Sequence, residues 1–289
     1  MTKLLVIPSN LKILEEINNY CDGLIIGVEN FSVNTPLKLS LNEIKNVVEK
    51  YSNSKDIFVS VNKNIHNEEI NKLIEVLQFL DSLSIKGIIY YDIAVVELKK
   101  KLDLKSDLVW NQEHLTTNYA TCNFWQKFGV DYAYLSSDIT LHEICDIKKN
   151  TSVKLLVTVF GYLPMFASYR HLVNNYLKTF SLPEGSGYEI EKEGKSYKII
   201  DNNLGSFVYS DSILNGISEY LQLRNNNIDY LVLNSFQIDD TDFTKIVKLF
   251  ANANEKNVNE YSKQIEKMYP NSDRGFFYKE TVYKVKNNE

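Results

Sequence analysis

The stretch that decides the fold runs Val153-Lys-Leu-Leu-Val-Thr-Val-Phe-Gly-Tyr-Leu-Pro-Met-Phe-Ala-Ser-Tyr-Arg-His171. Its first seven residues are mostly β-branched or aliphatic, which is typical of a buried strand. We expect the strand to end at Phe160 and Gly161, because glycine marks a position where a side chain would be in the way. Arg170 and His171 follow closely. In parallel α/β folds the carboxyl ends of strands carry binding and catalytic groups, so the segment predicts a functional site as well as a strand.

The same alternation of strand, polar end and helix recurs along the chain. Between the apolar runs, hydrophobic residues recur at helical spacing, and Ser40 with Glu43, like Thr140 with Glu143, fits a capping box. Regular alternation with short loops predicts a (β/α)8 TIM-type barrel, with a doubly wound open sheet as the alternative. Short apolar runs predict strands at residues 4–8, 23–28, 57–61, 87–91, 108–110, 132–135, 153–159 and 230–233.

One insertion interrupts this alternation, in the connection after the seventh strand. Residues 188–190 and 195–200 alternate on either side of Glu193-Gly194, which predicts a β-hairpin. Connections that follow barrel strands lie at the carboxyl end of the barrel. We therefore expect residues 187–209 to form a hairpin over the mouth.

The remainder of the chain is predicted to be helical before and after the eighth strand. Apolar residues at Ile213, Ile217 and Tyr220 indicate a helix that returns the chain to that strand. We expect residues 1–254 to form the barrel with its insertion. Residues 255–289 are then a C-terminal helix and an aromatic tail packed on the barrel.

Composition limits the class of protein. The chain has 289 residues, 44% hydrophobic and 24% charged, with a formal charge of −5 and a pI near 5.6. This balance favours a soluble protein without strong attraction to DNA or lipid, although a local basic patch remains open. No signal peptide or membrane-spanning run is evident, so we expect a cytoplasmic protein with no membrane or DNA partner. Three separated cysteines do not make a disulfide framework.

Polar side chains gather at the ends of the predicted strands. Most are uncharged, which suits hydrogen bonding to a small, polar, planar ligand at the barrel mouth. The alternative is that barrel mouths are polar simply because strands end there. The candidate residues are Glu29, Asn62, Asp92, Asn111, Gln112, Glu113, His114, Ser137, Asp138, Arg170, His171 and Asn234.

Specific catalytic motifs are missing from the sequence. It has no Gly-x-Ser-x-Gly, His-Glu-x-x-His, phosphate-binding Gly-x-x-x-x-Gly-Lys or Gly-x-Gly-x-x-Gly pattern. Ser168 with His171 or His114 is only a weak candidate for a nucleophile and base. No metal site is predicted, because Cys21, Cys122 and Cys145 are expected to be separate buried residues.

Four stretches resemble the peptidase U32 family, the collagenase-like proteins. They are most similar to the shorter bacterial member linked to 5-hydroxylation of the tRNA wobble uridine. Together they span nearly the whole chain, and the last three are specific in combination. The stretches are residues 21–27 (CDGLIIG), Trp110-Asn111 with 117–125 (TNYATCNFW), 165–176 (MFASYRHLVNNY) and 275–283 (GFFYKETVY).

The chain departs from the family pattern at several positions. Phe160-Gly161 replaces the usual His-Gly, and Pro164 and His171 stand where the family has cysteines. In hydroxylating relatives such cysteines are thought to hold an iron–sulfur cluster, which requires thiolate ligands. We therefore predict no cluster and no other cofactor in this chain. The family's glutamate after strand six is replaced by the shorter Asp138.

The resemblance implies a role in tRNA uridine 5-hydroxylation, acting directly or as a partner subunit of a longer U32 paralogue. A U32-type protease and a non-catalytic barrel that binds a ligand or partner are the alternatives, so whether the chain is an enzyme stays open. We assign catalytic roles to Arg170, Asp138 and Asn111, with Arg170 binding an anionic or polar group. An internal salt bridge from Arg170 to Asp92 or Glu29 is the competing interpretation. Substrate binding is assigned to Glu29, Asn62, Asp92, Gln112, His171 and Asn234.

Overall fold

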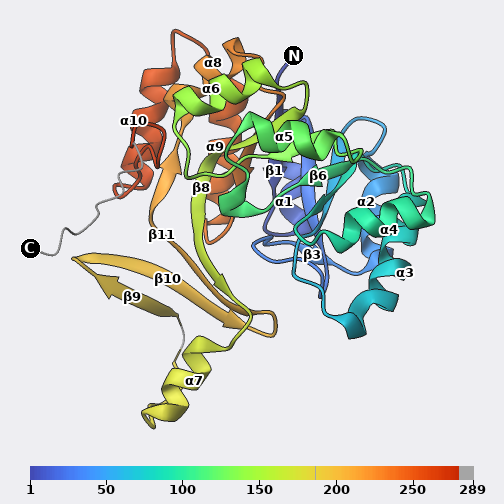
Figure 1. Ribbon diagram of the computed structural model, residues 1–289. Coiled ribbons are helices and arrows are strands. Elements are labelled where there is room, and N and C mark those ends of the chain that lie inside the picture. Colours follow the sequence, from blue (N-terminus) through green and yellow to red (C-terminus); the bar gives the residue numbers. More distant parts are fainter. Residues whose placement is uncertain (186, 280–289) are drawn as a thin grey trace, which may run out of the picture.

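The structure is a computed structural model that describes residues 1–185 and 187–279 (Figure 1). Within these residues, eight parallel strands form one closed ring, which confirms the predicted TIM-type barrel. The ring closes where the last strand pairs in parallel with the seventh, so the open-sheet alternative is wrong. The barrel strands are β1 (Lys3–Ile7), β2 (Gly23–Val28), β4 (Asp56–Val61), β5 (Gly87–Tyr90), β6 (Leu108–Trp110), β7 (Tyr132–Tyr134), β8 (Lys154–Ser168) and β12 (Tyr230–Asn234).

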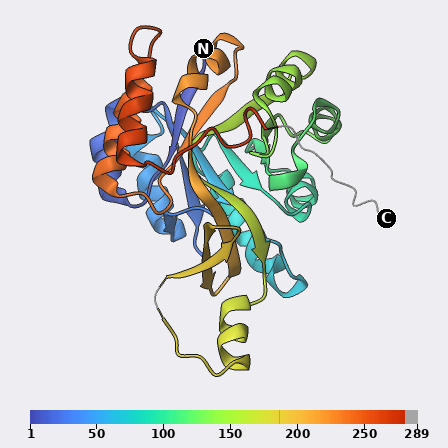
Figure 2. The same cartoon turned by 90° about the vertical axis from the view of Figure 1, so that its left-hand side faces the viewer.

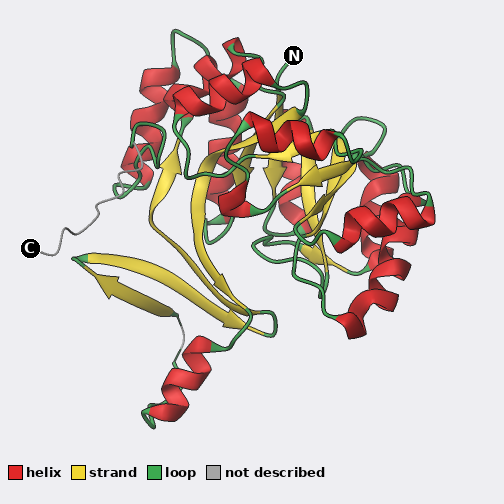
Figure 3. Ribbon diagram, in the orientation of Figure 1, coloured by secondary structure: helices red, strands yellow, loops and turns green. Residues whose placement is uncertain are grey.

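Helices cover the outside of the barrel (Figure 3). Both predicted capping boxes are confirmed, Ser40 with Glu43 and Thr140 with Glu143, so each helix begins where its sequence satisfies the free backbone N–H groups. A short strand, β3 (Lys38–Leu39), pairs with the end of β2. The helices are α1 (Leu11–Ile17), α2 (Leu41–Tyr51), α3 (Ile70–Asp81), α4 (Ala94–Leu102), α5 (Tyr119–Gln126), α6 (Leu141–Asn150), α8 (Ile217–Asn225), α9 (Asp240–Ala251) and α10 (Val258–Met268), with 3-10 turns η1 (Asn18–Tyr20), η2 (Asn67–Glu69) and η3 (Glu113–Leu115). None of the helices in the described ranges is both long and apolar enough to cross a membrane.

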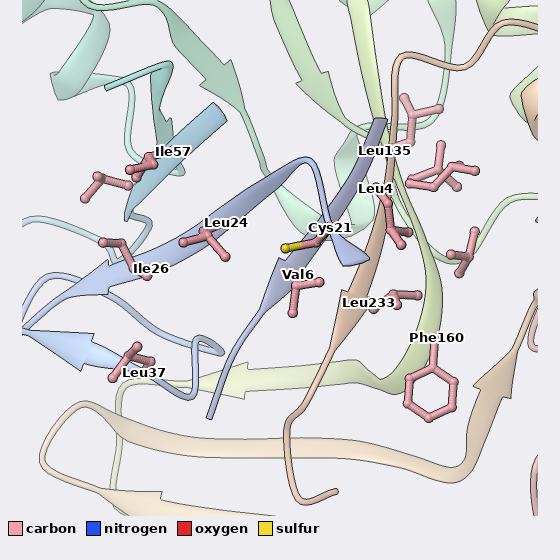
Figure 4. Packing of buried hydrophobic residues seen from close by; sticks show 14 of the residues in the cluster. Leu4, Val6, Cys21, Leu24, Ile26, Leu37, Ile57, Leu135, Phe160 and Leu233 are labelled. Atoms are coloured by element: carbon pink, nitrogen blue, oxygen red, sulfur yellow. The ribbon is translucent and has the colours of Figure 1, made fainter. Parts of the chain in front are cut away.

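The alternation of side chains along each strand divides the core in two. One set, including Leu5, Phe58 and Tyr132, fills the inside of the barrel. The other set packs between strands and helices, and Figure 4 shows Leu4, Val6 and other members of this set on their strands. The inside of the barrel is therefore a packed core.

The seventh strand differs most from its prediction. It does not end at Phe160 and Gly161 but continues to Ser168, because a second long strand, β11 (Gly205–Asn215), pairs with it in antiparallel fashion. The helix predicted around Ile213, Ile217 and Tyr220 is present, but it starts at Ile217, and Ile213 lies in β11 instead. The strand pair extends the sheet beyond the barrel.

The predicted hairpin is the outer part of this extension. Strands β9 (Tyr188–Lys192) and β10 (Lys195–Asn202) turn at Glu193-Gly194, and β10 pairs with β11. Helix α7 (Leu172–Thr179) joins β8 to the hairpin. We call residues 162–185 and 187–212 the arm; it projects from the mouth end of the barrel (Figure 2). No residue of β9 or β10 lines the mouth cavity, which the base of the arm borders instead.

Arg274 and Phe277 are among the residues that hold the C-terminal segment to the barrel. Arg274 Nη2 donates to Ser262 Oγ in α10 at 2.8 Å. Its Nε lies 3.6 Å from Oε1 of Glu219 in α8, a residue that is 4% exposed. The following Phe277 is buried, and its carbonyl accepts a hydrogen bond from Leu141. Residues 280–289, which include the last part of the predicted aromatic tail, lie outside the described residues.

We predict that Gly161→Ala destabilises the fold strongly. Gly161 has φ +123°, and a Cβ there would lie 2.7 Å from the carbonyl oxygen of Asn234 in β12. Backbone strain of this kind costs about 1–3 kcal/mol, and the clash with backbone adds to it. Chemical denaturation should show a loss of at least about 2 kcal/mol.

The matched control is Gly129→Ala. Gly129 also has a positive φ, +77°, but a methyl group added there would meet no atom within 4 Å. It should lose only about 1 kcal/mol. Equal losses in the two variants would show that the contact with Asn234 is unimportant.

Candidate functional site

A cavity of about 80 Å³ opens at the mouth of the barrel. Its lining includes residues at or just beyond the carboxyl end of every barrel strand, and loops and the arm complete it. The base is apolar and the walls are polar. The lining residues are Ile7, Ile25, Asn34, Thr35, Ser60, Asn62, Ile89, Asn111, Glu113, His114, Tyr134, Leu135, Ser136, Ser137, Asp138, Thr158, Tyr162, Pro164, Tyr209 and Asn234.

Two hydroxyl groups lie above the apolar base. Tyr134 Oη and Thr158 Oγ1 are 2.9 Å apart, on the neighbouring strands β7 and β8. Burial raises the pKa of Tyr134 to about 12, so its phenol is neutral at physiological pH. This pair can donate to and accept from a ligand without carrying charge.

A hydrogen-bonded chain links the arm to the cavity wall. Tyr209 Oη in β11 donates to Asn34 Oδ1 at 2.7 Å, and Asn34 Nδ2 donates to Glu113 Oε1 at 2.6 Å. Asn34 and Glu113 both adopt positive φ, +55° and +41°. Such backbone conformations are unfavourable for non-glycine residues and recur at functional sites. Burial raises the pKa of Glu113, opposed by the hydrogen bond from Asn34.

Next to Glu113, His114 and Asp138 form a pair. His114 Nδ1 is hydrogen-bonded to Asp138 Oδ2, which joins the loop after β6 to the loop after β7. The hydrogen bond with Asp138 raises the pKa of His114, because the carboxylate stabilises the protonated ring. The mouth thus holds two carboxyl groups and one histidine within a single lining.

The structure brings together four of the assigned site residues. Asn62, Asn111, Asp138 and Asn234 all line the mouth cavity. Glu113, His114 and Ser137, which the sequence also placed at strand ends, line it as well. Their gathering follows from the barrel, since residues at equivalent ends of parallel strands share one edge.

Five assigned residues lie outside the cavity lining, and three of them follow barrel strands. Glu29 is exposed where the β2 end meets β3. Asp92 accepts hydrogen bonds from the backbone of Ile65 and Ala94, which gives it a structural role in two loops. Gln112 donates to the carbonyl of Tyr91 at 3.0 Å. Their substrate-binding roles remain proposals.

Arg170 and His171 lie on the arm, because β8 continues to Ser168. Both residues are exposed and neither lines the cavity. His171 Nδ1 lies 2.9 Å from Asp201 Oδ1 in β10. Among residues 1–185 and 187–279, Arg170 forms no salt bridge, so the proposed ion pairs with Asp92 and Glu29 are absent there.

Sequence reasoning missed several lining residues. Asn34 and Thr35 lie in the long loop after β2, and its polar residues gave no strand-end signal. Tyr162, Pro164 and Tyr209 belong to the arm, which only the pairing of β8 with β11 brings to the mouth. Asn34 has one detectable signal, since asparagine tolerates positive φ better than most residues.

Two positions bear on the predicted absence of an iron–sulfur cluster. Pro164 at the cavity and His171 on the arm offer no thiolate, which such clusters require. In the part of the chain that the structure describes, no three His, Cys, Asp or Glu residues are grouped to hold a metal. Cys21 before β2, Cys122 in α5 and Cys145 in α6 are all buried, and burial raises the pKa of each thiol.

Comparison with known proteins agrees with this geometry at the level of family. The family model "Peptidase family U32" matches residues 10–286. The chain belongs to this family. It is 27% identical to "tRNA hydroxylation protein P2" of Bacillus subtilis, over 97% of this chain and 99% of that protein.

Two further relatives differ in length from this chain. An "uncharacterized protease" of Methanocaldococcus jannaschii is 22% identical over 97% of this chain and 74% of that protein. "tRNA hydroxylation protein P1" of Bacillus subtilis is 23% identical over 61% of this chain and 42% of that protein. The matched names therefore include both tRNA hydroxylation and proteolysis.

We predict that Asp138→Asn lowers the pKa of His114, because the main cause of its elevation is removed. A raised folded pKa means that His114 contributes stability below its unfolded pKa of about 6.5 and loses it as pH rises through the folded value. In the variant, this pH dependence of the unfolding free energy should weaken. NMR titration of the histidine ring protons measures the pKa directly.

The control is Asp201→Asn, which removes the partner of His171 on the arm. It should leave the titration of His114 unchanged. If Asp138→Asn also leaves it unchanged, the two side chains do not interact in solution.

Proposed function

We propose that this protein acts in 5-hydroxylation of uridine in tRNA, either as the modifying enzyme or as a subunit of it. The observation that carries the proposal is the mouth cavity, in which Asn62, Asn111, Asp138 and Asn234 converge as hydrogen-bonding groups. The likeness to a tRNA hydroxylation protein over nearly the full length of both chains supports it.

Proteolysis is the less favoured alternative. One feature favours proteolysis, which is the His114–Asp138 pair beside Ser136 and Ser137. A serine protease also needs a hydroxyl hydrogen-bonded to the histidine. Among the described residues, no serine or threonine hydroxyl is bonded to His114; Ser136 Oγ instead accepts from the Asp138 backbone.

Roles within the proposed site follow from charge and position. Asp138 would orient and charge His114, and Asn111 would bind substrate at the end of β6. Arg170 is assigned to the phosphate backbone of the RNA, because it is exposed on the arm beyond the cavity. Glu29, Asp92, Gln112 and His171 would contribute to the outer surface that meets the substrate.

A partner subunit follows from the missing thiolates. We propose that this chain carries no iron–sulfur cluster and that a longer U32 paralogue supplies the redox centre. Chain lengths support this idea, since this chain covers only 42% of the P1 relative. We place the protein in the cytoplasm, where tRNA is modified. A barrel that only binds its partner or ligand is the third possibility.

Deleting the gene should lower the amount of 5-hydroxyuridine and its derivatives in cellular tRNA. Mass spectrometry of tRNA nucleosides measures this, and a plasmid carrying the wild-type gene should restore the modification. Asp138→Asn should restore little of it, because the variant weakens the charge on His114 at the centre of the site.

Casein hydrolysis by the purified protein serves as the second arm of this experiment. Unchanged nucleosides together with casein cleavage that Asp138→Asn abolishes would replace the proposal by a protease. Unchanged nucleosides without cleavage would favour the non-catalytic barrel.

Arg170→Ala should weaken tRNA binding without altering thermal stability, since the side chain is exposed. Loss of one phosphate contact should reduce the slope of log K against log salt by about 0.7–0.9. Arg170→Lys should recover part of the affinity by restoring the charge but not the planar pair of donors. Fluorescence anisotropy at several salt concentrations measures the slope.

Lys127→Ala is the control for net charge. Lys127 follows the carboxyl end of α5, which lies at the opposite end of the barrel from the mouth. Its loss should leave the salt slope unchanged. A lower melting temperature in Arg170→Ala would make Arg170 a structural residue instead.

A further inference from the structure

Two asparagines in the mouth cavity present amide donors with a fixed orientation. Asn62 Oδ1 accepts from the backbone N–H of Val33, and Asn234 Oδ1 accepts from that of Phe236, each at 2.9 Å. Because backbone donors hold the amide oxygens, the orientation of each side chain is fixed and its NH2 group is left as a free donor. The residues are 7% and 8% exposed, and their NH2 groups have no partner within the described ranges.

A third side-chain amide in the lining also lacks a hydrogen-bond partner among the described residues. The side chain of Asn111 makes no hydrogen bond to any residue that the structure describes, and it lies at the end of β6 in the cavity wall. Donors that line an open cavity are satisfied by water or by a bound ligand. A cavity with several unpaired donors therefore fits a ligand that brings oxygen acceptors.

The charge of the lining favours a neutral ligand. It contains Glu113 and Asp138 with one histidine, and no lysine or arginine is among the lining residues that the structure describes. A carboxylate or phosphate would meet no lysine or arginine there, and His114 is already paired with Asp138. One oxygen of Glu113 is taken by Asn34, and the other is left to accept an N–H group from a ligand.

The size of the cavity limits the ligand to about one ring. A water needs roughly 10–15 Å³ of such volume, so a cavity of about 80 Å³ holds on the order of half a dozen waters. A single pyrimidine ring replaces a cluster of that size. A whole nucleotide would leave its sugar and phosphate outside, towards the arm.

We propose that the mouth cavity binds a uracil base flipped out of an RNA loop, with Asn62 and Asn234 donating to its carbonyl oxygens. Uracil offers two carbonyl acceptors around one N–H donor, which matches amide donors beside a carboxylate. Enzymes that act on a base commonly take it out of its stack in this way. This inference rests on the proposed function and names the group that the site recognises.

Aromatic residues on the arm suit the nucleotides on either side. Phe166 is 49% exposed and Tyr169 is 39% exposed, and Tyr169 Oη accepts from the backbone N–H of Asn64 in the loop after β4. That hydrogen bond places Tyr169 at the rim of the mouth. Exposed aromatic rings beside a groove bind single-stranded bases by stacking.

The donors predict that uracil is preferred over cytosine. Cytosine places an amino donor where uracil has an oxygen, and that donor would face an amide NH2 group. Discrimination at one such position is typically tenfold or more. An anticodon hairpin RNA with uridine at the wobble position should therefore bind at least about tenfold more tightly than the same hairpin with cytidine or an abasic site there.

The test compares these three hairpins by fluorescence anisotropy at pH 8.5 with wild-type protein, Asn62→Asp and Asn234→Asp. Aspartate keeps the oxygen that accepts the loop N–H and replaces the NH2 donor with an acceptor. The uridine preference should fall severalfold in both variants while thermal melting stays close to wild type. Asn202→Asp is the matched control, because Asn202 Oδ1 likewise accepts a backbone N–H two residues on, at 2.9 Å, but outside the cavity. It should keep the preference.

Equal binding of the three hairpins by wild-type protein would overturn the proposal. So would a uridine preference that survives in both aspartate variants, since other residues would then read the base. Displacement of the hairpin by millimolar succinate, but not by uridine, would assign the cavity to an anionic ligand instead. If nucleoside analysis still shows loss of 5-hydroxyuridine on gene deletion, the proposed function stands and only the base pocket is rejected.

Discussion

The rest of the structure depends on the close approach of Gly161 to the carbonyl of Asn234. At this point β8 finishes its parallel pairing with β12 and begins its antiparallel pairing with β11. A side chain would hold the two strands apart at the contact that closes the barrel. Gly161 thus allows the barrel to close and also allows β8 to continue beyond the barrel. The arm, and with it Tyr209, reaches the mouth only because both conditions are met.

At the mouth, some side chains are oriented by one hydrogen bond and keep a second hydrogen-bonding group available to a ligand. Asn34 has both ends of its amide bonded, to Tyr209 and Glu113, and acts as a strut between the arm and the wall. Asn62 has only its oxygen bonded. Identical side chains therefore serve different purposes, and the difference comes from the backbone that surrounds each one. Pre-oriented donors of this kind lower the entropy cost of binding.

The barrel could be predicted because its signals are local. Buried runs, capping boxes and short loops can each be recognised from a few consecutive residues. Asn62, Asn111, Asp138 and Asn234 were found because strand ends in a barrel converge. The course of β8 could not be predicted, since a strand continues past a glycine and a proline only when a distant partner such as β11 pairs with it. That error placed Arg170 and His171 at the mouth and left Tyr209 and Asn34 unrecognised. Residues positioned by long-range pairing give no such signal in one sequence.

The burial of the three cysteines has a practical consequence for handling the protein. Burial raises the thiol pKa of Cys21 and Cys122 to about 11, and that of Cys145 in the same direction. Oxidants and alkylating agents react with the thiolate, so a thiol that stays protonated and covered reacts slowly. The cysteines of the folded chain should therefore stay reduced during purification in air without a reducing agent. Alkylation by a thiol reagent can then report unfolding, because the cysteines become reactive only when the barrel opens.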